Sequence, residues 1–133
     1  MKIGILTSGG DCQALNAAMR GVAKTIFNSG QDVEIYGFLE GYKGLIYGNF
    51  QMLTGKDFIG ILTKGGTILG SSRTPFKTIK DPDENGLNKV EAMKQNYYKL
   101  NKFYLVIHFA FLLKLRFFQI PIRSKTQIML LYL

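Results

Sequence analysis

The chain has 133 residues, of which 47% are hydrophobic, and a single cysteine. This length fits one globular domain, and one cysteine excludes an internal disulfide. The longest apolar run, Phe103 to Leu113, is shorter than the roughly 20 residues that span a bilayer, so we expect no transmembrane helix and no membrane partner. The N-terminus lacks a signal-peptide pattern, and we expect a cytoplasmic protein.

The positive charge is concentrated near the C-terminus. Seventeen basic and nine acidic residues give a formal net charge of +8, which favours anionic partners in general. Five of the basic residues and none of the acidic ones follow Asn101, so the first 101 residues hold twelve basic and nine acidic residues, a net charge of +3. This body is only mildly basic, and we therefore expect no nucleic-acid partner.

The first third of the chain predicts alternating strands and helices. Lys2 to Thr7 is an apolar run typical of a buried strand, and a glycine turn follows it. Asp32 to Phe38 predicts a second strand, and Glu40 to Gly44 predicts a loop. Between the strands, apolar residues recur at helical spacing: Leu15, Met19, Val22 and Ile26. This order is the beginning of a βαβ series, and the predicted fold class is α/β.

The middle of the chain continues this pattern less regularly. Thr54 followed by Asp57 predicts the start of a short helix that runs to Leu62. After two glycines, Thr67 to Leu69 is expected to form a short strand. Apolar residues then return at helical spacing: Leu87, Val90, Met93, Tyr97 and Leu100. A strand is expected to follow this last helix.

The composition changes abruptly after Asn101. From Lys102 to Leu133 the chain contains no Gly, Asp or Glu. Phe103 to Phe109 is still compatible with a strand, whereas the last residues, 117–133, fit neither a helix nor a strand. We therefore divide the chain into a body, residues 1–101, and an apolar basic tail, residues 102–133.

Two glycine-rich turns indicate phosphate chemistry. In "LTSGGDCQALNAAMRG" a strand delivers Gly9 and Gly10 to the N-terminus of a helix, where backbone N–H groups can meet an anion. In "KGGTILGSSRTPFK" Arg73 follows a second glycine turn, and its guanidinium suits bidentate contact with phosphoryl oxygens. Neither turn matches the G-x-G-x-x-G or P-loop pattern. A purely structural turn and a solvated arginine therefore remain alternatives.

Other candidate residues have structural alternatives as well. Tyr42 can stack on a nucleobase or, as is more common, cover an edge of the core. Arg20 and Lys24 are four residues apart and share a helix face, which fits an anion site or a solvated surface equally well. Cys12 near a helix N-terminus can be a nucleophile, but a buried structural cysteine is the more common case.

Together these segments resemble one family. "KIGILTSGGDCQALNAAMRGV", "EGYKGL" and "GGTILGSSRTPF" stand in the order and spacing of the N-terminal part of 6-phosphofructokinases, over residues 2–76. The resemblance implies a Rossmann-like, three-layer α/β fold that is incomplete here. It implies transfer of a phosphoryl group in glycolysis from ATP with Mg²⁺, or in some branches from pyrophosphate, to the 1-hydroxyl of fructose 6-phosphate. A homo-oligomer is implied for the full-length family.

The resemblance also implies roles for single residues. Gly10 matches a glycine that lies against the donor phosphates, and Tyr42 matches a tyrosine beside the nucleotide. Arg73 matches an arginine that stabilises charge on the transferring phosphoryl group. Thr74 matches a neighbouring nucleotide contact, at which many ATP-using members carry an aromatic residue.

The match to the family weakens in two places. Arg20 and Lys24 resemble part of an allosteric site for ADP or phosphoenolpyruvate, with lysine in place of a second arginine. After Asn101 the family's "GGDG" or "GGNG" turn, which holds Mg²⁺ and the donor, does not appear, and neither does the "TIDND"-like segment that supplies the base. No metal ligand is therefore assigned in this chain.

These departures lead to a hypothesis and two alternatives. Because phosphoryl transfer depends on positioning and on neutralising charge, we expect the chain to be inactive alone. A frameshift or an early stop near codon 101 would explain the tail. The alternatives are a non-catalytic regulatory module that binds phosphate or nucleotide, and a membrane-surface protein that uses the tail.

Overall fold

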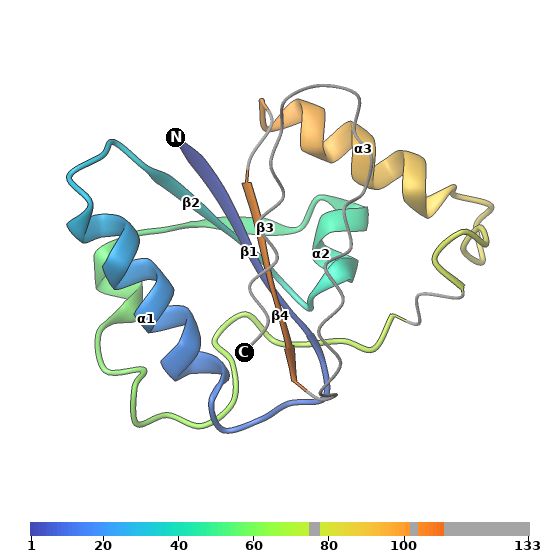
Figure 1. The fold of residues 1–133 in the computed structure, drawn as a ribbon. Helices are drawn as coiled ribbons and strands as arrows, with labels where there is room; N and C mark the ends of the chain where they lie inside the picture. Colours follow the sequence, from blue (N-terminus) through green and yellow to red (C-terminus); the bar gives the residue numbers. More distant parts are fainter. Residues whose placement is uncertain (75–77, 102–103, 111–133) are drawn as a thin grey trace.

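The computed structural model describes residues 1–74, 78–101 and 104–110. In these residues a mixed sheet lies between two layers of helices, with α1 and the short 3₁₀ helix η1 on one side and α2 and α3 on the other (Figure 1). The elements in chain order are β1 (Lys2–Gly9), α1 (Leu15–Asn28), β2 (Glu34–Phe38), α2 (Tyr42–Tyr47), β3 (Phe50–Leu53), η1 (Gly55–Phe58), α3 (Lys89–Lys99) and β4 (Tyr104–Ala110). The predicted α/β class and its three layers are confirmed.

The sheet has the strand order β3-β2-β1-β4. β1 runs parallel to both of its neighbours, so that Ile3 pairs with Ile35 on one side and with Tyr104 on the other. β3 is antiparallel to β2 and forms an edge. The strand expected after the last helix is therefore present as β4, and it lies beside β1.

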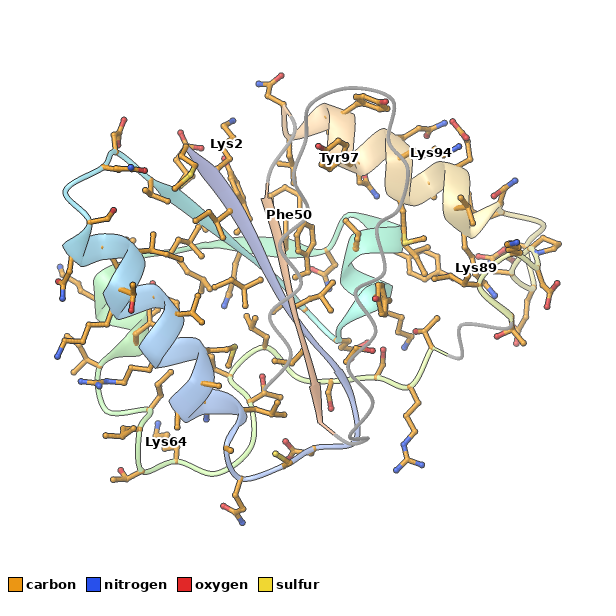
Figure 2. All side chains as sticks on the ribbon, in the orientation of Figure 1. Lys2, Phe50, Lys64, Lys89, Lys94 and Tyr97 are labelled. Carbon is orange, nitrogen blue, oxygen red and sulfur yellow. The ribbon has the colours of Figure 1, made fainter. Side chains whose placement is uncertain are left out.

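Side chains of β1 alternate between two hydrophobic clusters, one on each face of the sheet. Ile5 faces α1 and belongs to the first cluster, together with Met19. Leu6, next in sequence, belongs to the second cluster, together with Phe38, Leu45 and Tyr97. Phe50 packs against that second cluster, with its ring edge-to-face to that of Phe38 (Figure 2). Each face of β1 therefore has its own helical cover.

Two segments form regular secondary structure that the sequence did not predict. Glu40 to Gly44 was expected to be a loop, but the helix α2 begins at Tyr42. Gly44 lies inside this helix and does not end it. Glycine is needed there because a Cβ would lie 2.3 Å from the carbonyl oxygen of Leu39. β3, at Phe50–Leu53, was not expected, and its four residues are too short to give a clear alternation.

Two other segments have less regular structure than the sequence predicted. The helix expected to run from Thr54 to Leu62 is only the 3₁₀ helix η1, which begins where the Asp57 carboxylate accepts hydrogen bonds from the backbone N–H and the hydroxyl of Thr54 (2.7 and 2.8 Å). The strand expected at Thr67 to Leu69 is a turn instead, in which the Gly70 N–H donates to the Thr67 carbonyl. Positive φ at Gly66 and Gly70 (77° and 69°) turns the chain there.

The sheet extends past the point at which the sequence was divided. β4 begins beyond Asn101, and it pairs with β1 from Tyr104 to Ala110. The rest of the proposed tail, residues 111–133, lies outside the described residues. The division at Asn101 stays a prediction, although a strand of the sheet lies on its C-terminal side.

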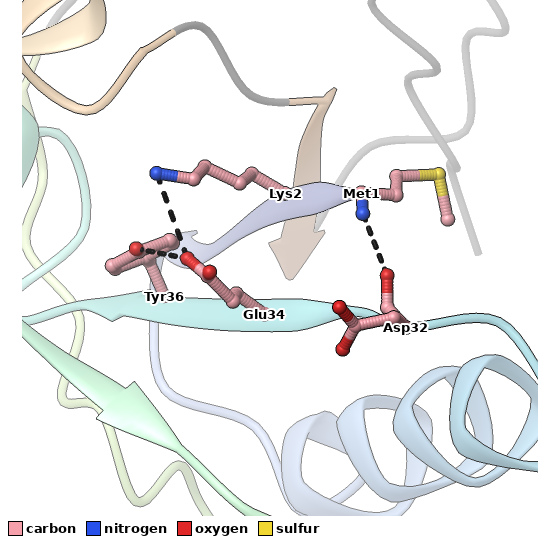
Figure 3. Close-up of polar contacts among 5 residues, drawn as sticks. All are labelled: Met1, Lys2, Asp32, Glu34 and Tyr36. Carbon is pink, nitrogen blue, oxygen red and sulfur yellow. Dashed lines mark hydrogen bonds and ion pairs between the residues drawn. The ribbon is translucent and has the colours of Figure 1, made fainter.

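Polar contacts among several residues join the amino ends of β1 and β2 (Figure 3). The Lys2 ammonium lies 3.6 Å from a Glu34 carboxylate oxygen, and the Tyr36 hydroxyl donates to the same oxygen at 2.5 Å. This hydrogen bond lowers the pKa of Glu34 and raises the pKa of Tyr36. The amino group of Met1 donates to the Asp32 carbonyl at 2.6 Å. These contacts support the pairing of the two strands at the end opposite to the glycine turn.

Candidate functional site

The candidate site lies at the carboxyl end of β1. The strand ends at Gly9, whose φ of 108° is accessible almost only to glycine. The carboxyl ends of β1, β2 and β4 point the same way because the three strands are parallel. In open α/β sheets this is the edge at which ligands bind.

The glycine turn is not the start of the first helix. α1 begins at Leu15, and Asp11 to Ala14 separate it from Gly10. The N–H of Leu15 donates to the Cys12 carbonyl, and the N–H of Asn16 donates to the Gly66 carbonyl at 2.9 Å. These two N–H groups already have acceptors. The two glycines therefore do not lie in the first turn of α1. The phosphate cradle stays a prediction, and it depends on the Gly9–Gly10 turn itself.

The segment around Arg73 lies along the end of β1. Ser72 forms an isolated parallel bridge with Ser8, and its carbonyl accepts a hydrogen bond from the Gly9 N–H at 3.3 Å. The exposed Arg73 side chain reaches Gly10: its Nη2 lies 3.6 Å from the point at which a Cβ on Gly10 would stand. Two of the predicted donor-phosphate residues, far apart in the sequence, are thus brought together.

Buried hydroxyl groups hold the second glycine turn against the strand. Thr7 is fully buried, and its hydroxyl donates to the Gly70 carbonyl at 2.7 Å. The Thr7 hydroxyl oxygen also lies 3.0 Å from the Thr67 hydroxyl oxygen, and the Thr67 hydroxyl accepts a hydrogen bond from the N–H of Leu69. Thr7 was not among the residues selected from the sequence, although a hydroxyl inside an apolar strand is a signal of such a contact.

A buried amide ties α1 to the same turn. Asn16 is only 2% exposed, and its side-chain Nδ2 donates to the Lys64 carbonyl at 3.1 Å. Its Oδ1 accepts from the N–H of Ile68 at 2.8 Å. Lys64 accordingly lies beside the first turns of α1 (Figure 2). Asn16 was also not selected from the sequence. The available signal was an amide side chain within an apolar helix face.

Tyr42 lies at the turn from β2 into α2. The preceding Gly41 has φ 65°, and a Cβ on it would stand 2.6 Å from the Thr7 carbonyl oxygen, so this turn is pressed against β1. Tyr42 is half-buried and packs against the cluster that contains Leu6 and Phe38. This packing fits the core-edge role weighed for Tyr42. Stacking on a nucleobase stays a prediction.

The remaining candidates are less closely connected to the turn. Thr74 is half-buried and follows Arg73 directly. Arg20 and Lys24 lie one turn apart on α1, half-buried and exposed respectively, and neither has a hydrogen bond or ion pair among the described residues. Cys12 is a half-buried free thiol. The roles of these residues stay predictions.

The described part of the chain offers no metal centre. No group of three or more His, Cys, Asp or Glu side chains that could hold a metal ion occurs in residues 1–74 and 78–101. Backbone groups, hydroxyls and the Arg73 guanidinium meet at the end of β1 and suit an anion, and the single carboxylate of Asp11 lies beside the second glycine turn. None of the described helices has the length and apolarity needed to cross a membrane.

Comparison with known proteins agrees with this geometry. The family model described as "Phosphofructokinase" matches residues 2–108. The match therefore continues beyond Asn101 and through most of β4, past the point at which the composition changes. Similarity covers the sheet and both glycine turns.

Curated relatives match the same part of the chain. An ATP-dependent 6-phosphofructokinase of Spirochaeta thermophila is 52% identical over 109 residues, which cover 78% of this chain and 29% of that protein. An ATP-dependent 6-phosphofructokinase of Aquifex aeolicus is 52% identical over 75 residues, 56% of this chain and 23% of that protein. The chain thus spans less than a third of the length of these relatives.

Solved structures show the same fold. Phosphofructokinase of Pichia pastoris in the T-state matches with a TM-score of 0.66 and 32% identity, over 80% of this chain and 11% of that one. A pyrophosphate-dependent phosphofructokinase from Marinobacter aquaeolei matches with a TM-score of 0.64 over 82% of this chain and 26% of that one, at 16% identity, and shows the fold alone. With the family match over residues 2–108, these likenesses show that the chain belongs to the phosphofructokinase family.

Proposed function

We propose that this chain carries the donor-phosphate part of a 6-phosphofructokinase site. The observation that supports the proposal most directly is the approach of the Arg73 guanidinium to Gly10 at the carboxyl end of β1. Because Gly10 has no side chain, a phosphate can approach the backbone between it and Arg73. The donor is then ATP or pyrophosphate, and the acceptor in the complete family site is fructose 6-phosphate.

Arg73 has the central chemical role in this proposal. Its planar guanidinium can donate two parallel hydrogen bonds to phosphoryl oxygens. Since negative charge on the transferring group spreads over its oxygens in the transition state, a fixed cation beside them lowers the barrier. Thr74 would contact the nucleotide beside it, and Tyr42 would lie along the nucleotide.

The chain by itself is proposed to bind the donor without turnover. The sequence contains neither the glycine-aspartate turn that holds Mg²⁺ in the family nor the segment that supplies the base. Mg²⁺ bound to the donor phosphates would neutralise part of their charge. Among the described residues, which include no metal-binding group, Arg73 would neutralise a further part of it. A cytoplasmic location, a homo-oligomer of the complete protein and an allosteric role for Arg20 and Lys24 belong to the same proposal.

Calorimetric titration of the full 133-residue chain with MgATP and with sodium pyrophosphate tests the proposal. We expect binding of at least one of the two, a loss of about tenfold or more in affinity for Arg73→Ala, and unchanged affinity for the control Lys94→Ala, which removes an exposed cation on α3. A coupled assay with fructose 6-phosphate should show no turnover. Absence of binding to both donors, or equal affinities of the wild type and Arg73→Ala, would overturn the proposal.

A further inference from the structure

The turn between β2 and α2 has an unusual backbone. Glu40 has φ 54° and Gly41 has φ 65°, so two successive residues have positive φ. Residues with a side chain rarely adopt this conformation, and it persists where the surroundings fix it. Glu40 is fixed on both sides: its N–H donates to the Leu69 carbonyl at 2.8 Å, and its carbonyl accepts from the Ser72 hydroxyl at 2.5 Å.

Ser72 connects three segments of the candidate site. Its hydroxyl holds the turn at Glu40, and its carbonyl accepts from the Gly9 N–H at 3.3 Å and from the Ser8 hydroxyl at 3.4 Å. The end of β1, the turn before α2 and the segment that carries Arg73 therefore meet at this one residue. The neighbouring Ser71 has a hydroxyl for which the described residues show no hydrogen bond, and it provides a natural comparison.

The direction of successive side chains links Ser72 to Arg73. Ser72 bridges β1 as an extended residue, and in an extended segment adjacent side chains point to opposite sides. The Ser72 hydroxyl points to the Glu40 carbonyl, while Arg73 reaches Gly10. Holding the first side chain in place therefore sets the direction of the second.

We propose that Ser72 is a positioning residue that fixes Arg73 against Gly10. The inference rests on the proposed donor-phosphate site and adds to it the residue that sets the place of the cation. Ser72 has no contact with the phosphate in this proposal. Its effect on binding passes through Arg73.

Amide hydrogen exchange of the ligand-free chain tests the structural part. Gly9 and Glu40 donate the two amide hydrogen bonds next to Ser72, so we expect their exchange to become about fivefold faster in Ser72→Ala. Ser71→Ala and the hydroxyl-retaining Ser72→Thr should leave both rates near those of the wild type, and the amides of α3 serve as an internal reference. Unchanged exchange at Gly9 and Glu40 in Ser72→Ala would overturn the proposal.

A double-mutant cycle with sodium pyrophosphate tests the link to Arg73. We expect Ser72→Ala to weaken binding about fivefold in the wild-type background and to have no effect in the Arg73→Ala background. An equal loss in both backgrounds would contradict a role through Arg73. If the wild type binds MgATP and not pyrophosphate, the same cycle is measured with MgATP. Failure of the wild type to bind both donors would overturn the proposed function, and the exchange rates would then decide for or against Ser72 as the residue that orders this segment.

Discussion

The guanidinium Nη2 of Arg73 lies 3.6 Å from the point that a Cβ atom on Gly10 would occupy. This spacing is ordinary van der Waals contact, so a methyl group would fit there without displacing the arginine. It would, however, fill the space between the guanidinium and the backbone. The requirement for glycine at this position is therefore expected to concern the ligand and not the fold.

Gly10→Ala tests this distinction. Gly10 does not have a positive φ, so we expect nearly unchanged thermal stability and clearly weaker binding of pyrophosphate. Gly21→Ala is the matched control: a Cβ there meets nothing within 4 Å, and the change should stabilise α1 by about 0.5–1 kcal/mol without affecting binding. Thermal unfolding and calorimetric titration of both variants provide the comparison. Equal affinities of Gly10→Ala and the wild type would contradict it.

Gly41→Ala should damage the fold itself. A Cβ at Gly41 would stand 2.6 Å from the Thr7 carbonyl oxygen, and φ is 65°, so strain and overlap add. We expect a loss of about 2–4 kcal/mol in the free energy of unfolding. Gly30→Ala has a similar φ of 70° with nothing within 4 Å, and it should cost only about 1 kcal/mol. Chemical denaturation measures both, and equal losses would show that Gly41 is not pressed against β1.

Glu40→Gly is expected to stabilise the chain. Glycine adopts the positive φ of 54° without strain, which favours the variant by about 1 kcal/mol. The change also removes the ion pair with Lys43, whose nitrogen lies 3.2 Å from the carboxylate, but both side chains are more than half exposed and such pairs contribute little. Glu40→Gln removes the charge and keeps the strain, so its melting temperature should stay near that of the wild type. A lower melting temperature for Glu40→Gly than for Glu40→Gln would contradict the argument.

Asp57 should make stability depend on acidity. Hydrogen bonds from the backbone N–H and hydroxyl of Thr54 lower the pKa of Asp57 in the folded chain. A lowered folded pKa means that the contribution is present above the unfolded value, about 3.9, and is lost as the pH falls through the folded pKa. The difference in melting temperature between the wild type and Asp57→Asn should therefore shrink below about pH 4. Parallel curves from neutral to acid pH would exclude this cause.

Local patterns were sufficient for the elements with strong periodicity. The apolar run from Lys2 and the helical spacing from Leu15 predicted β1 and α1, because burial of a strand or of a helix face leaves its period in the sequence. Gly41 and Gly44 led to the prediction of a loop. Glycine is needed at these two positions because they pack closely against Thr7 and Leu39. Such packing depends on tertiary neighbours and leaves no local pattern in the sequence.

The candidate site was predictable in its residue types and not in its supports. Gly10 and Arg73 were selected because a glycine turn and a guanidinium suit phosphate. That they meet depends on the bridge between Ser8 and Ser72, a contact between distant segments. Ser72 was missed for the same reason, since its significance comes from its acceptor on Glu40.

The frameshift hypothesis now has a more definite position. The family match runs to residue 108, within β4, instead of ending at Asn101. We therefore expect that translation of the coding DNA in its other frames gives a "GGDG"- or "GGNG"-like turn directly after the codons of β4. Resequencing from the codon of Lys94 provides all three frames. If none of them encodes such a turn, the residues after β4 belong to the genuine reading frame.

The most direct measurement is an NMR titration of the isotopically labelled chain with sodium pyrophosphate and, in a second sample, with MgATP. The response below is required for at least one of them. If Gly10 and Arg73 hold the donor phosphates, the amides of Gly9 and Gly10 and the Nε–H of Arg73 should shift together and saturate with one dissociation constant. Arg20 and Lys24 on α1 should remain unaffected at the same concentrations. Shifts confined to α1, or no saturable shift at the end of β1, would contradict a donor-phosphate site at this place.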